Sequence, residues 1–215
     1  MRVEEAIGRE LARLGLDQVF GVVGSGNFHV TNALVGAGVR FVATRHEAGA
    51  AIMADAYART TGRVAAVTVH QGCGLTNALT GITEAAKSRT PLLVLAADTA
   101  TWNTLSNFHI DQPAVLRGLG VHSESITSPR TAVQEAVGAF RRAAVGRRTV
   151  VLNLPLDVQE AEVPPDALPA FPFPYSTPWS PAPGRSSGWR SSCGRRSGRS
   201  SSPAGAPAWR EPATP

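Results

Sequence analysis

Cysteine is scarce in this 215-residue chain, which contains only Cys73 and Cys193. Two cysteines so far apart do not make the disulfide framework of a small secreted protein, so a reducing, cytoplasmic setting is expected. The sequence also lacks any apolar run near the ~20 residues that a membrane helix needs. Its first residues, MRVEE, do not have the basic flank and apolar run of a signal peptide. These absences favour a soluble cytoplasmic protein.

Large aliphatic residues are missing from the C-terminal part of the chain. Residues 171–215 contain no Leu, Ile, Val or Met, and Glu211 is their single acid. Such a segment buries too little apolar surface to offset the entropy of ordering its backbone. We therefore predict one folded domain over residues 1–165 and a disordered tail, rich in Pro, Ser, Arg and Gly, over residues 166–215.

The excess of basic charge is confined to that tail. The six arginines and one glutamate of residues 171–215 account for the whole net charge of +5, because residues 1–170 hold 15 basic and 15 acidic side chains. The folded part therefore offers no basic stripe, and no nucleic-acid partner is expected. RNA binding by the tail, with Trp189 and Trp209 near its arginines, is the weaker alternative.

Apolar periodicity within residues 1–165 alternates between that of helices and that of strands. Val3, Ile7, Leu11 and Leu14 recur at the three- and four-residue spacing of an amphipathic helix. Short apolar runs predict strands at 19–23, 39–43, 63–69, 91–97 and 149–154. Helices are expected up to residue 36, over 48–60, up to residue 87 and over 131–145. This order is typical of a doubly wound α/β fold, a parallel sheet with helices on both faces.

Ligands of such sheets bind beyond the carboxyl ends of the strands, which are followed here by loops 24–27, 44–47, 70–74 and 98–112. The first loop is not a dinucleotide fingerprint, because His29 stands where the third glycine belongs. No Gly-x-x-x-x-Gly-Lys-Ser/Thr motif occurs, so the sequence does not predict a P-loop nucleotide site.

Two of the remaining loops are candidates for chemistry. Glu47 opens a predicted helix whose first residues are small and allow close packing, although a carboxylate there can simply face the helix dipole. The later loop places Gly72 and Gly74 on either side of Cys73. These glycines let the backbone approach a ligand, or they make an ordinary tight turn.

Several segments together resemble one enzyme family. They are Arg45-His46-Glu47, ADAYAR at 54–59, GCGLTN at 72–77, SRTPLLVLA at 88–96 and IDQ at 110–112. In this order they resemble the N-terminal, pyrimidine-binding domain of thiamine diphosphate enzymes of the acetolactate synthase and benzoylformate decarboxylase group. The resemblance covers residues 1 to about 160. Cys73 is a departure, because the family usually has proline there.

The resemblance implies that Glu47 is the catalytic residue that activates the cofactor. In that family the glutamate hydrogen-bonds N1′ of the aminopyrimidine ring and favours its imino tautomer, which then removes the thiazolium C2 proton. The resemblance also implies cofactor-binding positions for a further set of residues: Gly72, Cys73, Gly74 and Asn77.

Four side chains that follow predicted strands are candidates for facing the substrate: Asn27, His29, His70 and Gln71. An outward position on the following helix suits His29 equally well. His109 and His122 are expected at the surface.

The second half of the family's active site is not recognisable in this sequence. That half binds the diphosphate through Mg²⁺ with a Gly-Asp-Gly motif, and no Gly-Asp-Gly occurs here. The resemblance therefore implies that a missing domain, or a partner subunit in a homo- or hetero-oligomer, holds Mg²⁺. This chain would hold only the pyrimidine end of thiamine diphosphate, would have no metal site and would not turn over alone.

Three explanations stay open. In the first, the chain is the truncated product of a disrupted gene with an out-of-frame tail, in line with its 20 arginines against one lysine. In the second, it is the natural pyrimidine-binding subunit of a split enzyme, and in the third it is a non-catalytic association module. The sequence does not name the substrate, and it does not separate a 2-keto acid decarboxylase, a lyase, from an acetolactate-type transferase.

Overall fold

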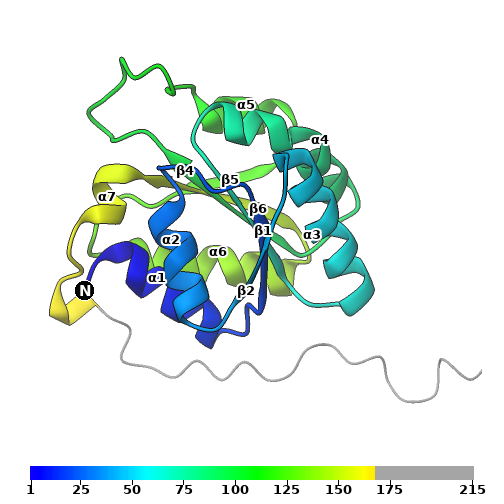
Figure 1. The fold of residues 1–215 in the computed structure, drawn as a ribbon, viewed down its shortest axis with the longest axis horizontal. Helices are drawn as coiled ribbons and strands as arrows, with labels where there is room; N and C mark the ends of the chain where they lie inside the picture. Colours follow the sequence, from blue (N-terminus) through cyan, green and yellow to red (C-terminus); the bar gives the residue numbers. More distant parts are fainter. Residues whose placement is uncertain (168–215) are drawn as a thin grey trace, which may run out of the picture. The chain divides into compact units, whose positions relative to one another are not determined.

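A computed structural model describes residues 1–167 and shows six strands in one parallel sheet (Figure 1). The strand order is β2-β1-β3-β4-β6-β5. The strands are β1 (Gln18–Gly21), β2 (Arg40–Ala43), β3 (Ala65–Val69), β4 (Leu92–Asp98), β5 (His122–Ser125) and β6 (Thr149–Pro155). The predicted doubly wound α/β fold is confirmed. The predicted tail lies outside the described residues, apart from Asp166 and Ala167 in a short 3-10 turn, η1 (Pro165–Ala167).

The helices divide between the two faces of the sheet. They are α1 (Val3–Arg13), α2 (Phe28–Gly36), α3 (Glu47–Thr61), α4 (Cys73–Lys87), α5 (Gln112–Gly118), α6 (Ala132–Gly146) and α7 (Leu156–Glu160). Side chains of α1, α2, α6 and α7 form one apolar core with the sheet, and those of α3, α4 and α5 form the other. Within residues 1–167, no helix has both the length and the apolar character needed to cross a membrane.

Each central strand contributes to both cores because successive side chains point to opposite faces. In β4, Leu93 and Leu95 belong to the core beneath α1, α2 and α6, whereas Leu92 and Val94 belong to the core beneath α3 and α4. All four are fully buried. Burial on both faces explains why this strand is a continuous apolar run in the sequence.

One strand and two α-helices of the structure were not predicted from the sequence. β5 has the polar sequence HSES because it is an edge strand whose side chains are largely half-buried or exposed. α5 begins at Gln112-Pro113 and has only seven residues, and α7 has five. Elements this short carry too few apolar positions for a periodic signal.

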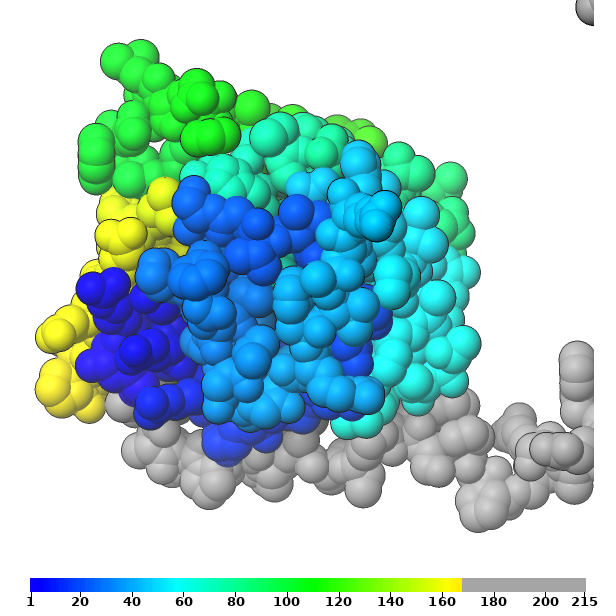
Figure 2. All heavy atoms as spheres, viewed as in Figure 1, coloured from blue at the N-terminus to red at the C-terminus, as the bar shows by residue number. Residues whose placement is uncertain are grey.

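The strand order reverses between β1 and β3, which are neighbours in the sheet. The loop after β1 leads to α2 on one face, whereas the loop after β3 leads to α4 on the other. A crevice at the carboxyl ends of such strands is the usual ligand site of this fold. The segment after β4 extends outward from the same domain, as Figures 1 and 2 show, and it carries the exposed side chains of Trp102 and Leu105.

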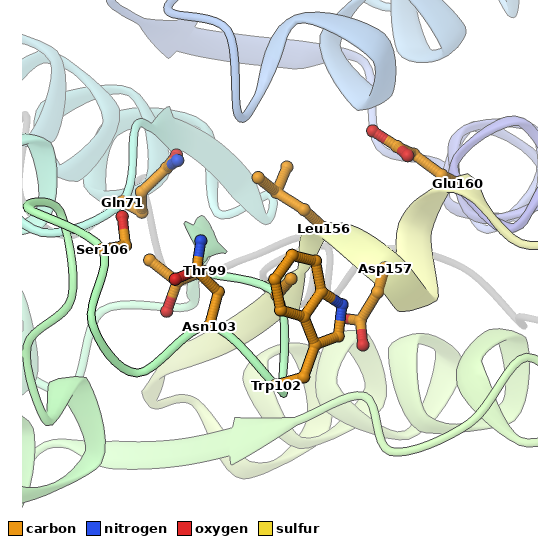
Figure 3. Close-up of a pocket in the computed structure, with 9 residues that line it drawn as sticks. Gln71, Thr99, Trp102, Asn103, Ser106, Leu156, Asp157 and Glu160 are labelled. Carbon is orange, nitrogen blue, oxygen red and sulfur yellow. The ribbon is translucent and has the colours of Figure 1, made fainter.

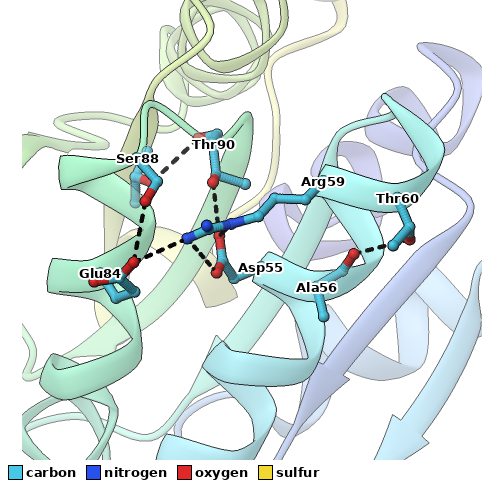
Figure 4. A network of polar contacts seen from close by, with 8 residues as sticks. Asp55, Ala56, Arg59, Thr60, Glu84, Ser88 and Thr90 are labelled. Carbon is cyan, nitrogen blue, oxygen red and sulfur yellow. Dashed lines mark hydrogen bonds and ion pairs between the residues drawn. The ribbon is translucent and has the colours of Figure 1, made fainter. Parts of the chain in front are cut away.

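A buried carboxylate ties α3 and α4 to the segment before β4 (Figure 4). Asp55 Oδ1 accepts hydrogen bonds from Thr90 Oγ1 at 2.6 Å and from Arg59 Nε at 2.9 Å. The same guanidinium also contacts Glu84 Oε1 on α4 at 3.2 Å. Asp55 and Thr90 are both buried, so each relies on the other in place of water.

Replacing Asp55 by alanine is expected to lower the free energy of unfolding by about 2–4 kcal/mol, because the buried Thr90 hydroxyl loses its acceptor. Glu84→Ala is the matched control, since it removes the other acid that contacts Arg59. The Glu84 side chain is 61% exposed, so a loss below about 1 kcal/mol is expected. Urea denaturation measures both values, and equal losses would contradict this role for Asp55.

Candidate functional site

Glu47 is the first residue of α3 and directly follows the short loop after β2. The helix begins here because His46 is extended and its Nδ1 accepts the Ala48 N–H at 3.1 Å, which caps the helix. An acidic side chain in the first turn is also stabilised by the helix dipole. Glu47 is nevertheless only 8% exposed, so its carboxylate is held inside the protein surface.

The two oxygens of the Glu47 carboxylate have different surroundings. Asn77 Nδ2, on α4, donates a hydrogen bond to Oε2 at 3.0 Å. Oε1 lies beside Gly74, where an added Cβ would be 3.6 Å away, and it accepts no hydrogen bond from residues 1–167. The predicted cofactor residues Glu47, Gly74 and Asn77 are thus brought together across the α3–α4 contact, with one acceptor oxygen still available.

The loop before α4 has a backbone shape that requires glycine. Gly72 has φ +64° and ψ −107°, and an added Cβ would lie 2.4 Å from the Phe108 carbonyl oxygen. Cys73 follows as the first residue of α4, with an exposed, free thiol. Its role as a cofactor contact stays a prediction.

A chain of buried amides holds this loop from behind. The Gly72 N–H donates to Gln112 Oε1 at 3.1 Å. Gln112 Nε2 in turn donates to the Ala97 carbonyl and to Asn153 Oδ1, both at 3.1 Å. Gln112 and Asn153 are fully buried, and Asn153 also donates to the Glu124 carbonyl of β5. The position of Gly72 therefore depends on β4, β5 and β6.

His70 and Gln71 follow β3 and differ in their contacts. His70 is half-buried, with Nε2 3.2 Å from Ser25 Oγ and its ring edge-to-face with Phe108. The pair with Ser25 spans the ends of β1 and β3, where the strand order reverses. Gln71 is only 4% exposed, and its Oε1 has no hydrogen-bond partner within residues 1–167.

Asn27 and His29 occupy different environments. Asn27 is fully buried: its Oδ1 accepts the Gly24 N–H, and its Nδ2 donates to the Val22 carbonyl and Thr68 Oγ1. These contacts brace the loop after β1. His29 is exposed in the first turn of α2, on the face opposite to the helix of Glu47. A direct substrate contact by either residue stays a prediction.

Asp98 ends β4 close to a second histidine. Burial raises the pKa of the Asp98 carboxyl, although the Thr99 N–H donates to its Oδ1 at 2.8 Å and opposes the shift. Thr99 Oγ1 lies 3.0 Å from Nδ1 of His109. The His109 side chain is exposed, as is that of His122, in agreement with the sequence prediction.

Two contacts at the candidate site have weak signals in the sequence. Ser25 lies in loop 24–27 directly after β1, where ligand-binding residues are common, but it is not one of the predicted site residues. Gln112 acts on Gly72 from 40 positions away, and such a tertiary contact has no local pattern. The sequence pointed to Gln112 only as part of Ile110-Asp111-Gln112, one of the segments that carry the family resemblance.

The side chains around Glu47 suit a planar nitrogen heterocycle better than a metal ion. Glu47 Oε1 has no donor from residues 1–167 and lies beside Gly74, where a Cβ would narrow the space, so it fits a ring nitrogen that carries or shares a proton. An aminopyrimidine has this chemistry, so the residues present fit the pyrimidine end of thiamine diphosphate. Within residues 1–167, no three His, Cys, Asp or Glu side chains cluster as metal ligands would.

Comparison with known proteins gives a match of residues 1–115 to the family described as "Thiamine pyrophosphate enzyme, N-terminal TPP binding domain". The chain is 37% identical over 181 residues to the acetolactate synthase isozyme 3 large subunit of Escherichia coli (81% of the chain, 30% of the relative). It is 35% identical over 169 residues to a probable 2-ketoarginine decarboxylase of Pseudomonas aeruginosa (75% of the chain, 30% of the relative).

A third relative, the sulfoacetaldehyde acetyltransferase of Rhodobacter capsulatus, is 30% identical over 161 residues (74% of the chain, 27% of the relative). The chain thus spans less than a third of the length of these curated relatives. The family match covers more than half of the chain, including the Glu47–Asn77 pair and the Gly72 loop. The chain therefore belongs to the thiamine pyrophosphate enzymes, whose N-terminal TPP binding domain it contains.

Proposed function

We propose that this chain binds the aminopyrimidine end of thiamine diphosphate, as the pyrimidine half of an enzyme that acts on 2-keto acids. The observation that carries the proposal is the Glu47 carboxylate. Asn77 fixes Oε2 at 3.0 Å, while Oε1 lies beside Gly74 without a donor from residues 1–167. A protonated ring nitrogen would supply the missing donor.

Each residue of the site then has a defined task. When bound, thiamine diphosphate supplies a carbon nucleophile and an electron sink for the substrate carbonyl. Glu47 holds a proton between Oε1 and the ring nitrogen, and Asn77 orients the carboxylate as a positioning residue. Gly72 and Gly74 let the ring approach the backbone. Gln112 keeps the Gly72 N–H, and with it the loop, in place.

The diphosphate and its Mg²⁺ are proposed to lie on another domain or subunit. Within residues 1–167, the site has neither a metal-ligand cluster nor a cationic side chain in contact with Glu47. We therefore expect weak cofactor binding and no turnover by this chain without a diphosphate-binding partner. The assembled enzyme would be an oligomer, and a cytoplasmic location is part of the same proposal.

The reaction class follows from the relatives and is also a proposal. Their names include acetolactate synthases, which are transferases of a two-carbon unit, and a probable 2-ketoarginine decarboxylase, which is a lyase. Both reactions begin from a 2-keto acid. His70 and Gln71 end β3 next to the Gly72 loop, so they are the side chains best placed to face such a substrate.

The test is binding of the pyrimidine fragment 4-amino-5-hydroxymethyl-2-methylpyrimidine to the full chain by equilibrium dialysis. A ligand of this size should bind with a dissociation constant on the order of 1–10 mM. Glu47→Gln should weaken binding at least fivefold, because the amide lacks the negative charge that attracts the ring proton. Glu84→Gln, an exposed acid on α4, is the control and should bind as wild type does.

The outcome decides between two accounts of the chain. Equal binding by wild type and Glu47→Gln would contradict the role of Glu47. Failure of the wild-type chain to bind the fragment or thiamine diphosphate, even with a diphosphate-binding partner present, would instead support a non-catalytic association module.

A further inference from the structure

Cys73 carries a free thiol at the start of α4, between the two glycines of the candidate cofactor loop. The side chain is exposed and forms no disulfide. Its backbone is the first residue of a 15-residue helix, and Gln112 holds the preceding Gly72 N–H at 3.1 Å. The thiol therefore stands on a fixed backbone and is open to small molecules from solvent.

The register between α3 and α4 shows which way Cys73 faces. Asn77 Nδ2 contacts Glu47 at 3.0 Å, and a Cβ added on Gly81 would lie 2.6 Å from Ala51 Cβ. Cys73 precedes Asn77 by four positions, so the two side chains share one face of the helix, with Cβ atoms about 5–6 Å apart. Helical side chains tilt toward the N-terminus, so the thiol lies beyond Asn77, near the carboxyl ends of the strands.

An unsatisfied carboxylate oxygen borders the same space. Glu47 is 8% exposed, and its Oε1 accepts no hydrogen bond within residues 1–167. This oxygen lies beside Gly74, the residue after Cys73, at 3.6 Å from an added Cβ. A buried acceptor without a donor points to a ligand that brings an N–H group. The thiol and the open oxygen thus both adjoin the position proposed for the pyrimidine ring.

The other side of the loop borders a different space. A pocket of about 320 Å³ lies between the segment after β4 and α7, and Gln71 is one of its lining residues (Figure 3). Neither Cys73 nor Glu47 lines that pocket. A group attached to Cys73 would therefore take up space on the Glu47 side of the loop.

We propose that Cys73 is a reversible modification site, at which a small-molecule disulfide closes the pyrimidine site. The Cys73 sulfur attacks one sulfur of the disulfide and a new S–S bond forms. The original S–S bond breaks, and the other half leaves with the thiol proton. The attached group excludes the ring from Glu47, and a reducing thiol frees Cys73 by the same exchange. This inference rests on the proposed function, because the excluded ligand is the ring.

The test uses the full chain with Cys193→Ser, in which Cys73 is the single thiol, and the neutral reagent 2,2′-dithiodipyridine. The absorbance of released thiopyridone follows the reaction. The modified chain should bind 4-amino-5-hydroxymethyl-2-methylpyrimidine weaker by about tenfold or more in equilibrium dialysis, and dithiothreitol should restore the affinity. Conversely, the fragment at about ten times its dissociation constant should slow thiopyridone release about tenfold, because few sites remain free.

The matched control moves the thiol to the other end of α4. Ser88→Cys, in a chain that also carries Cys73→Ser and Cys193→Ser, places it about 22 Å away along the helix axis. Ser88 is exposed, so the reagent should react there. Fragment binding by this control should be the same before and after modification, whatever the effect of Cys73→Ser itself.

Three results would overturn the proposal: unchanged fragment binding after modification of Cys73, an equal loss of binding in the Ser88→Cys control, or a reaction at Cys73 that the fragment does not slow. Circular dichroism of the modified chain should match that of the unmodified chain, and a lost helical signal would also contradict closure of an intact site. These results leave the proposed function standing. Absence of fragment binding by the unmodified chain would instead overturn the proposed function, and this inference with it.

Discussion

Gly72→Ala is expected to lower the free energy of unfolding by about 3–4 kcal/mol, a large share of the ~5–15 kcal/mol of a typical domain. Two causes add. The backbone at φ +64° and ψ −107° is open to glycine and strained for alanine. The new methyl carbon would also lie 2.4 Å from the Phe108 carbonyl oxygen, which must move.

The matched control is Gly36→Ala at the end of α2. No atom lies within 4 Å of the Cβ that this substitution adds, and Gly36 does not have a left-handed φ. Its free energy of unfolding should stay within about 1 kcal/mol of wild type. Urea denaturation of both variants measures the contrast. A Gly72→Ala variant as stable as Gly36→Ala would show that the loop does not need this conformation.

Glu47→Gln is expected to slow exchange of the C2 proton of thiamine diphosphate about ten- to a hundredfold, in a complex of the full chain with a diphosphate-binding subunit. A hydrogen bond to a charged group is worth about 1.5–3 kcal/mol, which sets this range. Glutamine keeps the shape of the side chain but neither carries the charge nor takes a proton. The rate is measured by quenched deuterium exchange followed by NMR.

Asn77→Ala provides the graded comparison for that experiment. Asn77 donates to Oε2 of Glu47 and acts through it, so its loss should slow exchange only about three- to tenfold. Glu84→Gln should exchange at the wild-type rate. A Glu47→Gln complex that exchanges as fast as wild type would remove Glu47 from the chemistry, whatever its effect on binding.

The sequence predicted the fold well where buried elements have a clearly apolar sequence. β4 and β6 are buried on both faces and are mostly apolar, with Asn153 the one polar residue inside the predicted β6 run VVLNL, so both were found. β5 was missed because HSES lies at the sheet edge and has no apolar pattern. α7 was missed because its five residues span little more than one helical turn, too few to show a helical period.

The candidate site was likewise predicted only in part. Glu47, Gly72, Gly74 and Asn77 were identified from short motifs, and the structure brings Glu47, Gly74 and Asn77 together. The support of Gly72 by Gln112 could not be predicted, because it depends on the distance between the Gly72 loop and the start of α5 rather than on local sequence. Nor could the unpartnered Oε1 of Gln71, which is a property of the packed structure alone.

Backbone NMR of the full chain during titration with 4-amino-5-hydroxymethyl-2-methylpyrimidine tests the central claim most directly, because it locates the bound ring. The account predicts that the amide signals of Glu47, Gly72, Gly74 and Asn77 shift together with one dissociation constant, and that Glu47→Gln abolishes these shifts. Saturable shifts confined to other parts of the chain, or shifts at these residues that persist in Glu47→Gln, would contradict a pyrimidine site organised by Glu47.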